Sequence, residues 1–239
     1  REEREEGHAL EAFEYWYNQR ALPGELIPAG AFLQASTYVK RSMKKERALD
    51  GAMADTTQWA SIGPDNVGGR VIAIAVHPTH PETVWVGSAS GGLWRSVTAG
   101  RGSNAWTRIN TGYPTIAVSS VAIYPSDPRL MFIGTGEIGA GYKFRQIGTP
   151  GARTTYGMGV LKSTDEGVTW SLTGLVYEFP QVTAVQKVII NPRNPKTVYA
   201  ATSEGTFKSV DGGDTWSLSH SILMAMDLLL NPVDTTILY

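Results

Sequence analysis

The sequence contains no cysteine among its 239 residues. Disulfides, thiolate metal sites and a cysteine nucleophile are therefore excluded for this chain. Charge is scarce as well, because only 18% of the residues are charged and the formal net charge is −1. We therefore expect no nucleic-acid partner and no attraction to an anionic membrane. No apolar run approaches the roughly 20 residues of a membrane-spanning helix, so no transmembrane segment is expected.

Turn-forming and aromatic residues are plentiful. The chain has 26 Gly and 13 Pro, and 10% of its residues are aromatic, which favours many short strands joined by tight turns. Its length suffices for one large or two small domains with a real core. The first residue is Arg1 rather than Met, which predicts that an N-terminal piece, such as a signal peptide, has been removed.

Residues 1–50 differ from the rest of the chain and are predicted to form a helical N-terminal extension. Apolar residues recur there at helical spacing. They form two stripes: Leu10, Phe13, Trp16 and Tyr17, then Phe32, Ala35, Val39 and Met43. Residues 51–56 are predicted to be a linker. Two interpretations of the extension stay open: a hairpin that docks onto a partner, or helices packed on the flank of the following domain.

Two stretches, residues 163–170 and 209–216, share the pattern S-x-D-x-G-x-T-W, and we call them the turn boxes. The Ser hydroxyl and the Asp carboxylate can bond nearby backbone N–H groups, and Gly supplies a positive φ. Thr and Trp then enter a strand and bury the indole. The residues predicted to have this structural role are Ser163, Asp165, Gly167, Thr169, Trp170, Ser209, Asp211, Gly213, Thr215 and Trp216.

The turn boxes belong to a larger repeat that fills residues 57–239. Each complete copy has four strand-length apolar runs, at a repeat length of about 40–50 residues that is typical of propeller blades. The sequence predicts an all-β fold: a partial β-propeller of four-stranded antiparallel blades, about three and a half in number, after an α-helical extension. The predicted parts are a closing strand at 59–62, blades at 70–110, 117–174 and 183–219, and the start of a fourth at 225–239. Because so few blades cannot close a ring, the chain is expected to be the front part of a longer protein.

The boxes resemble those of the Asp-box (BNR-repeat) propellers, which include sialidases, xyloglucan-cleaving glycoside hydrolases and sortilin (VPS10)-like ectodomains. The stretch 63–70 running into the first strand resembles one group still more, namely large secreted or surface-anchored bacterial proteins exported by the type IX system. The resemblance covers residues 57–239. It implies a secreted or cell-surface location outside the cytoplasm, and it says more about fold than about function.

The second copy carries a long insertion between its second and third strands. In a propeller whose boxes join the third and fourth strands, such a loop lies at the opposite end, where ligands usually bind. Its aromatic and Arg side chains could stack on sugars or grip a peptide. The alternative is an ordered loop that packs on its neighbours. The candidate ligand-face residues are Glu137, Tyr142, Phe144, Arg145, Arg153 and Tyr156.

Catalytic motifs are weak in this sequence. Glycoside hydrolysis needs two carboxyl groups beside a groove. The resemblance to xyloglucan-cleaving enzymes implies a base Asp in the first blade, but Ala89 stands at that position. His77 and His80 are separated by Pro78 in a predicted turn, so they are interpreted as turn residues rather than a zinc pair. We expect no catalytic residue, metal site or cofactor in this segment.

These observations predict a secreted or surface β-propeller that serves as a non-catalytic binding or scaffolding module for protein or glycan. A larger surface or secretion complex is the expected setting for such a module. The alternative is a glycoside hydrolase, sialidase-like or xyloglucanase-like, whose catalytic residues are completed beyond residue 239. A third possibility is a passive spacer whose binding surface is the helical extension. The sequence identifies neither the ligand nor the number of blades.

Overall fold

The computed structural model describes residues 30–49, 69–114, 117–137, 155–178, 181 and 183–239, together with residues 15, 18, 19 and 24. The chain divides into two units, Arg1–Asp55 and Thr56–Tyr239, and each is described by itself. The predicted closing strand at 59–62 lies outside the described residues, as do most of the first apolar stripe and the predicted linker at 51–56.

The first unit contains helix α2, Ala31–Leu49. The Thr37 hydroxyl donates to the Leu33 carbonyl one turn earlier, at 2.8 Å. Tyr38 and Val39 are exposed on this helix. No helix among the described residues combines the length and the apolarity that crossing a membrane requires. Whether the extension docks onto a partner stays a prediction.

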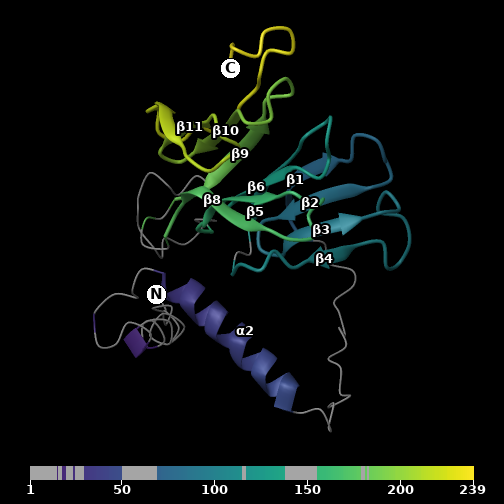
Figure 1. Ribbon diagram of the computed structural model, residues 1–239, viewed down its shortest axis with the longest axis vertical. Coiled ribbons are helices and arrows are strands. Elements are labelled where there is room, and N and C mark those ends of the chain that lie inside the picture. Colours follow the sequence, from purple (N-terminus) through teal and green to yellow (C-terminus); the bar gives the residue numbers. More distant parts are fainter. Residues whose placement is uncertain are drawn as a thin grey trace, which may run out of the picture. The chain divides into compact units, whose positions relative to one another are not determined.

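The second unit consists of three four-stranded antiparallel sheets, each with its strands in sequence order (Figure 1). We call them repeats one, two and three. Repeat one contains β1 Val71–Val76, β2 Val84–Ser88, β3 Gly92–Ser96 and β4 Thr107–Ile109. Repeat two contains β5 Val118–Ile123, β6 Met131–Thr135, β7 Gly159–Ser163 and β8 Ser171–Val176. Repeat three contains β9 Val185–Ile190, β10 Val198–Thr202, β11 Gly205–Ser209 and β12 Ser217–His220. The predicted fold class, four-stranded antiparallel propeller blades after an α-helical segment, is confirmed.

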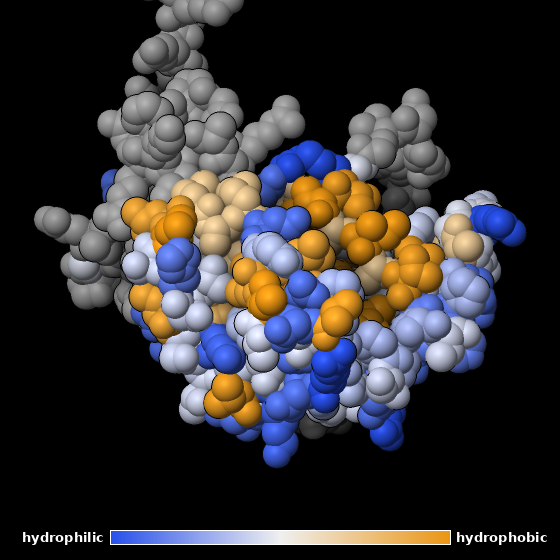
Figure 2. Space-filling view, turned by 90° about the horizontal axis from the view of Figure 1, so that it is seen from above, coloured by the Kyte–Doolittle hydropathy of each residue, from blue (hydrophilic) through white to orange (hydrophobic). Residues whose placement is uncertain are grey.

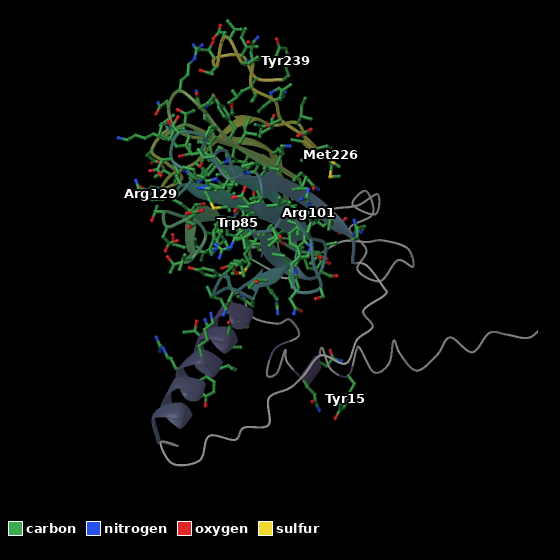
Figure 3. The ribbon with its side chains drawn as sticks, turned by 90° about the vertical axis from the view of Figure 1, so that its right-hand side faces the viewer. Tyr15, Trp85, Arg101, Arg129, Met226 and Tyr239 are labelled. Atoms are coloured by element: carbon green, nitrogen blue, oxygen red, sulfur yellow. The ribbon has the colours of Figure 1, made fainter. Side chains whose placement is uncertain are left out.

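The core lies between consecutive sheets, because neighbouring residues of a strand point to opposite faces. In β6, Met131 and Ile133 pack toward repeat one, around the fully buried Trp85. Phe132 points the other way and packs against Val185 and other residues of repeat three. Figure 3 shows Trp85 in the interior of the unit. The second strands of repeats two and three, β6 and β10, are buried on both faces along their whole length, which explains their apolar character.

The first strands of the repeats lie next to one another, β1 against β5 and β5 against β9. Two buried serines of β5 join it to β9. The Ser119 hydroxyl donates to the Val185 carbonyl, and the Ser120 hydroxyl accepts the Val188 N–H at 2.9 Å. Repeats two and three are therefore joined by hydrogen bonds between their first strands as well as by apolar packing.

Beyond β12 the chain begins a fourth copy, marked by an antiparallel bridge between Leu230 and Leu238. Leu228 packs there against Tyr199 and Ala201 of repeat three. Figure 2 shows patches of apolar side chains on the face of the molecule seen from above. The large apolar residues that are exposed after β12 are Ile222, Leu223, Met226, Leu229, Val233, Ile237 and Tyr239.

Candidate functional site

The strand directions give the second unit two distinct ends. The turn boxes join β7 to β8 and β11 to β12, so both lie at equivalent corners of their sheets. The connections from second to third strand lie at the other end of each antiparallel sheet, at residues 89–91, 136–158 and 203–204. We call this the loop end, and it carries the candidate site.

Each turn box is closed by the same set of hydrogen bonds. The Ser163 hydroxyl donates to Asp165 Oδ1 at 2.8 Å and accepts the Gly167 N–H at 2.8 Å. Asp165 Oδ1 accepts the Thr169 N–H at 2.8 Å. The indole N–H of Trp170 donates to the Gly167 carbonyl at 3.1 Å. The second box makes the equivalent bonds with Ser209, Asp211, Gly213, Thr215 and Trp216.

These hydrogen bonds hold the box carboxylates in their charged form. The Thr169 hydroxyl and then its N–H lower the pKa of Asp165 to about 2. The same bonds from Thr215 lower the pKa of Asp211. Protonation of either carboxylate would break hydrogen bonds of the turn. We therefore assign these two carboxylates a structural role rather than a role in proton transfer.

The turn boxes also join neighbouring repeats. A Cβ at Gly167 would lie 2.5 Å from the ring of Trp85 in repeat one, and one at Gly213 would lie 3.0 Å from the ring of Phe132 in repeat two. Lys162 adds a polar contact, since its ammonium donates to the Gly212 carbonyl at 2.7 Å. The glycine of each complete turn box therefore packs against a buried aromatic ring of the preceding repeat, Trp85 or Phe132.

Repeat one has an incomplete box. Its Ser96 hydroxyl accepts the Gly100 N–H at 2.8 Å, as in the complete boxes, but Thr98 stands in place of the Asp. Trp106 is 38% exposed, whereas Trp170 is 8% exposed. The turn therefore forms without the carboxylate.

The histidine pair lies in the turn from β1 to β2, at the turn-box end. Nδ1 of the buried His77 accepts the N–H groups of Thr79 at 3.2 Å and His80 at 3.1 Å. Its Nε2 contacts the Glu166 carboxylate of repeat two at 3.2 Å. Among the described residues, no group of three His, Asp or Glu side chains could hold a metal ion.

At the loop end, an ion pair connects repeats one and two. Both carboxylate oxygens of Glu137 accept hydrogen bonds from the Arg70 guanidinium, and this contact raises the pKa of Arg70. The backbone of Glu137 pairs with Thr155 across the base of the predicted loop. Tyr156 is half-buried nearby in sequence, and burial raises the pKa of its phenol. The other predicted ligand-face residues, namely Tyr142, Phe144, Arg145 and Arg153, lie outside the described residues.

The sheet register reveals a second loop-end carboxylate that the sequence motifs did not single out. Strands β2, β6 and β10 end at equivalent residues, because the last residue of each pairs with the first residue of the strand before it. Two positions further along the chain, the equivalent residues are Ser90, Glu137 and Glu204. Glu204 accepts a hydrogen bond from the Thr183 hydroxyl at 3.1 Å. Burial raises the pKa of the neighbouring Tyr177 to about 12, so its phenol stays protonated at neutral pH.

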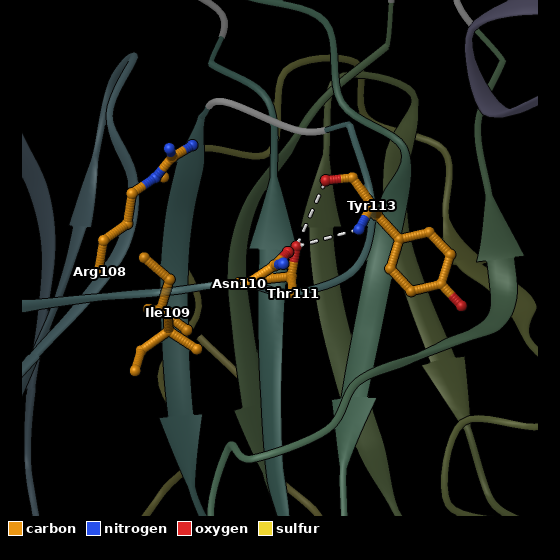
Figure 4. Close-up of a pocket in the computed structure, with 7 residues that line it drawn as sticks. Arg108, Ile109, Asn110, Thr111 and Tyr113 are labelled. Carbon is orange, nitrogen blue, oxygen red and sulfur yellow. Dashed lines mark hydrogen bonds between the residues drawn. The ribbon is translucent and has the colours of Figure 1, made fainter. Parts of the chain in front are cut away.

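A pocket of about 250 Å³ opens at the loop end of repeat one, near the end of β4 (Figure 4). Its lining residues are Gly92, Leu93, Arg108, Ile109, Asn110, Thr111 and Tyr113. The Thr111 hydroxyl accepts the Tyr113 N–H at 3.4 Å. The side-chain oxygen of Asn110, Oδ1, accepts the Gly112 N–H at 3.0 Å. The sequence did not identify this pocket, although Asn-Thr-Gly is a turn signal that ends a strand.

Comparisons with known proteins find glycoside hydrolases. A xyloglucanase of Hypocrea jecorina is 25% identical over 189 residues, which are 74% of this chain and 21% of the relative. The xyloglucanase Xgh74A of Acetivibrio thermocellus is 25% identical over 175 residues, or 69% of this chain and 19% of the relative. The solved structure of an ancestral GH74 enzyme has 24% identity and a TM-score of 0.46, over 68% of this chain and 19% of that one. No family model matches the chain.

The chain spans about a fifth of the length of these curated relatives. The expectation of a non-catalytic binding or scaffolding module, and of a protein that is not an enzyme, is wrong, because the matched relatives are xyloglucanases. The findings favour the alternative, a glycoside hydrolase. The error arose because the absence of a carboxylate at one position, Ala89, was taken as evidence against catalysis. A segment of this length need not contain both carboxyl groups of a glycoside hydrolase.

Proposed function

We propose that this chain is part of a glycoside hydrolase that cleaves xyloglucan or a closely similar β-glucan. The observation that carries the proposal is the similarity to xyloglucanases over about three quarters of the chain. The 189 aligned residues are too many to fall within one repeat, so the same architecture would present the substrate. A glycan is accordingly the proposed ligand, in preference to a protein.

The loop end is the proposed substrate side. Its connections vary between repeats, whereas the turn-box end is closed by nearly identical bonds in repeats two and three. Variable loops on a rigid scaffold are the usual place for binding and catalysis. Glu137 and Glu204 place carboxylates there in consecutive repeats, but Glu137 is paired with Arg70 and Glu204 is bonded to Thr183. We therefore propose that these two carboxylates shape the substrate side, and that the acid and base belong to the rest of the enzyme.

The finer resemblance to sortilin-like surface proteins and to type IX secretion cargo remains a proposal that rests on the box pattern and on residues 63–70. A polysaccharide hydrolase must meet its polymeric substrate outside the cytoplasm, so a secreted or cell-surface location fits the proposed activity. Detection of the protein in the culture medium or on the cell surface would support this location.

The test is an assay of the protein that contains this chain against xyloglucan, with carboxymethylcellulose as the comparison polymer and reducing ends as the readout. We expect new reducing ends from xyloglucan, released faster than from the comparison polymer. Protein that is folded by circular dichroism yet releases none from xyloglucan would contradict the proposed function.

A further inference from the structure

The pocket of repeat one exists because β4 is short. The last β3–β4 pair is Leu93 with Ile109, whereas in repeat two the corresponding pairing continues to Gly159 with Val176. A Cβ at Gly159 would collide with the Leu175 carbonyl at 1.9 Å. A Cβ at Gly92, the equivalent residue, would find Arg108 Nε as its nearest neighbour at 3.6 Å. The space that strand β8 fills in repeat two is therefore open in repeat one.

The lining of this space is polar and carries a positive charge. Arg108 is exposed, and its guanidinium makes no hydrogen bond or ion pair with the residues that the structure describes. The guanidinium of Arg70, by contrast, forms an ion pair with the Glu137 carboxylate. Figure 4 shows Arg108 and Tyr113 on opposite sides of Asn110 and Thr111. Guanidinium groups bind carboxylates through two parallel N–H bonds, which makes Arg108 a suitable partner for an anionic ligand.

The size of the space limits the ligand to one small ring. Pockets for drug-sized ligands begin near roughly 300 Å³, and this one has about 250 Å³. The side-chain NH2 group of the exposed Asn110 offers donors of the kind that ring hydroxyls accept. The Thr111 hydroxyl is buried and is bonded to the N–H and the carbonyl of Tyr113, so it shapes the pocket wall. The aromatic ring of Tyr113 is held in place, because its hydroxyl accepts the Leu172 N–H at 3.3 Å.

We propose that this pocket binds a single hexuronic acid residue of a glycan, with Arg108 on the carboxylate and with the side-chain NH2 group of Asn110 on the ring hydroxyls. The choice of a sugar rests on the proposed function, and the choice of an acidic sugar rests on the unpaired Arg108. The site would let the protein engage acidic side branches or neighbouring acidic polysaccharide, apart from the β-glucan backbone.

The test uses two probes, D-galacturonate and D-galactose, which differ only in having a carboxylate or a hydroxymethyl group on the ring. Binding to the protein is measured by titration calorimetry or ligand-observed NMR at low salt. The variant is Arg108→Gln, and its matched control is Arg101→Gln, an exposed arginine in the β3–β4 turn at the opposite end of the same repeat (Figure 3). Equal thermal midpoints would show that both variants fold.

We expect galacturonate to bind at least about tenfold more tightly than galactose, which is the scale of one hydrogen bond to a charged group. Arg108→Gln should remove this preference, and Arg101→Gln should leave it unchanged. Equal affinity for the two sugars, no binding of galacturonate, or a preference that survives Arg108→Gln would each overturn the inference. A protein that cleaves xyloglucan but ignores galacturonate refutes only this inference, whereas one that binds galacturonate through Arg108 but cleaves no xyloglucan refutes only the proposed activity.

Discussion

Replacing Trp85 with Ala is expected to lower the free energy of unfolding by about 3–5 kcal/mol, the usual cost of truncating a large buried aromatic residue. Trp85 is 0% exposed and lies in the core between repeats one and two, among Leu93, Met131 and Leu161. The box glycine Gly167 sits directly against its ring. The loss would therefore affect both the core and the seat of the turn box. Urea unfolding followed by tryptophan fluorescence and by circular dichroism measures it.

Trp85→Phe is the matched control for this prediction. It keeps an aromatic ring in the interface and removes the indole N–H, which is buried and has no hydrogen-bond partner among the described residues. Removing an unsatisfied donor offsets part of the lost packing, so the phenylalanine variant should be clearly more stable than the alanine variant. A loss below about 1 kcal/mol for Trp85→Ala would contradict a well-packed interface between these repeats.

Gly167→Ala is expected to cost about 2–5 kcal/mol, for two separable reasons. The residue has a φ of +78°, which costs an L-amino acid with a Cβ about 1–2 kcal/mol. The new methyl group would also lie 2.5 Å from the Trp85 ring, and such overpacking costs about 1–3 kcal/mol. The same denaturation experiment measures the change.

Gly102→Ala separates the two contributions. Gly102 also has a positive φ, +103°, but a Cβ there would meet nothing within 4 Å. Its substitution should therefore show only the cost of a sparsely populated backbone conformation, about 1–3 kcal/mol. If the two alanine variants lost equal stability, the contact between the turn box and the preceding repeat would not contribute, and the account of how the repeats are joined would fail.

Much of the fold could be predicted from the sequence because its repeat is local. A Ser, an Asp, a Gly and a Trp at fixed spacing specify a turn, and the apolar runs beside it specify strands. Apolar runs in the sequence that end at Ser88, Thr135 and Thr202 correspond to strands β2, β6 and β10, which end at these same residues. The first strands of repeats two and three were exceptions. They begin at Val118 and Val185, ahead of the apolar runs that start at Val121 and Val188, because Ser119 and Ser120 of β5 are bonded to β9 and such distant partners leave no local signal.

The candidate site was less predictable, because it depends on contacts between distant segments. Arg70 and Glu137 are 67 positions apart, and only the packing of repeat one on repeat two brings them together. The pocket beside Arg108 results from the length of β4 relative to β8, which appears only when the sheets are superposed in register. Glu204 likewise became a candidate through its register with Glu137. Catalysis was wrongly discounted, since the absence of a carboxylate at Ala89 was weighed as if this segment had to contain a complete catalytic pair, although the chain spans only about a fifth of the length of the matched xyloglucanases.

A crystal structure of the protein with a bound xyloglucan oligosaccharide would show which end of the propeller binds the substrate. We expect the sugar to lie across the loop end, within reach of the segments around Glu137 and Glu204, and the turn boxes to be unchanged. An oligosaccharide bound over the turn boxes near Asp165 and Asp211, with the loop end vacant, would contradict this expectation.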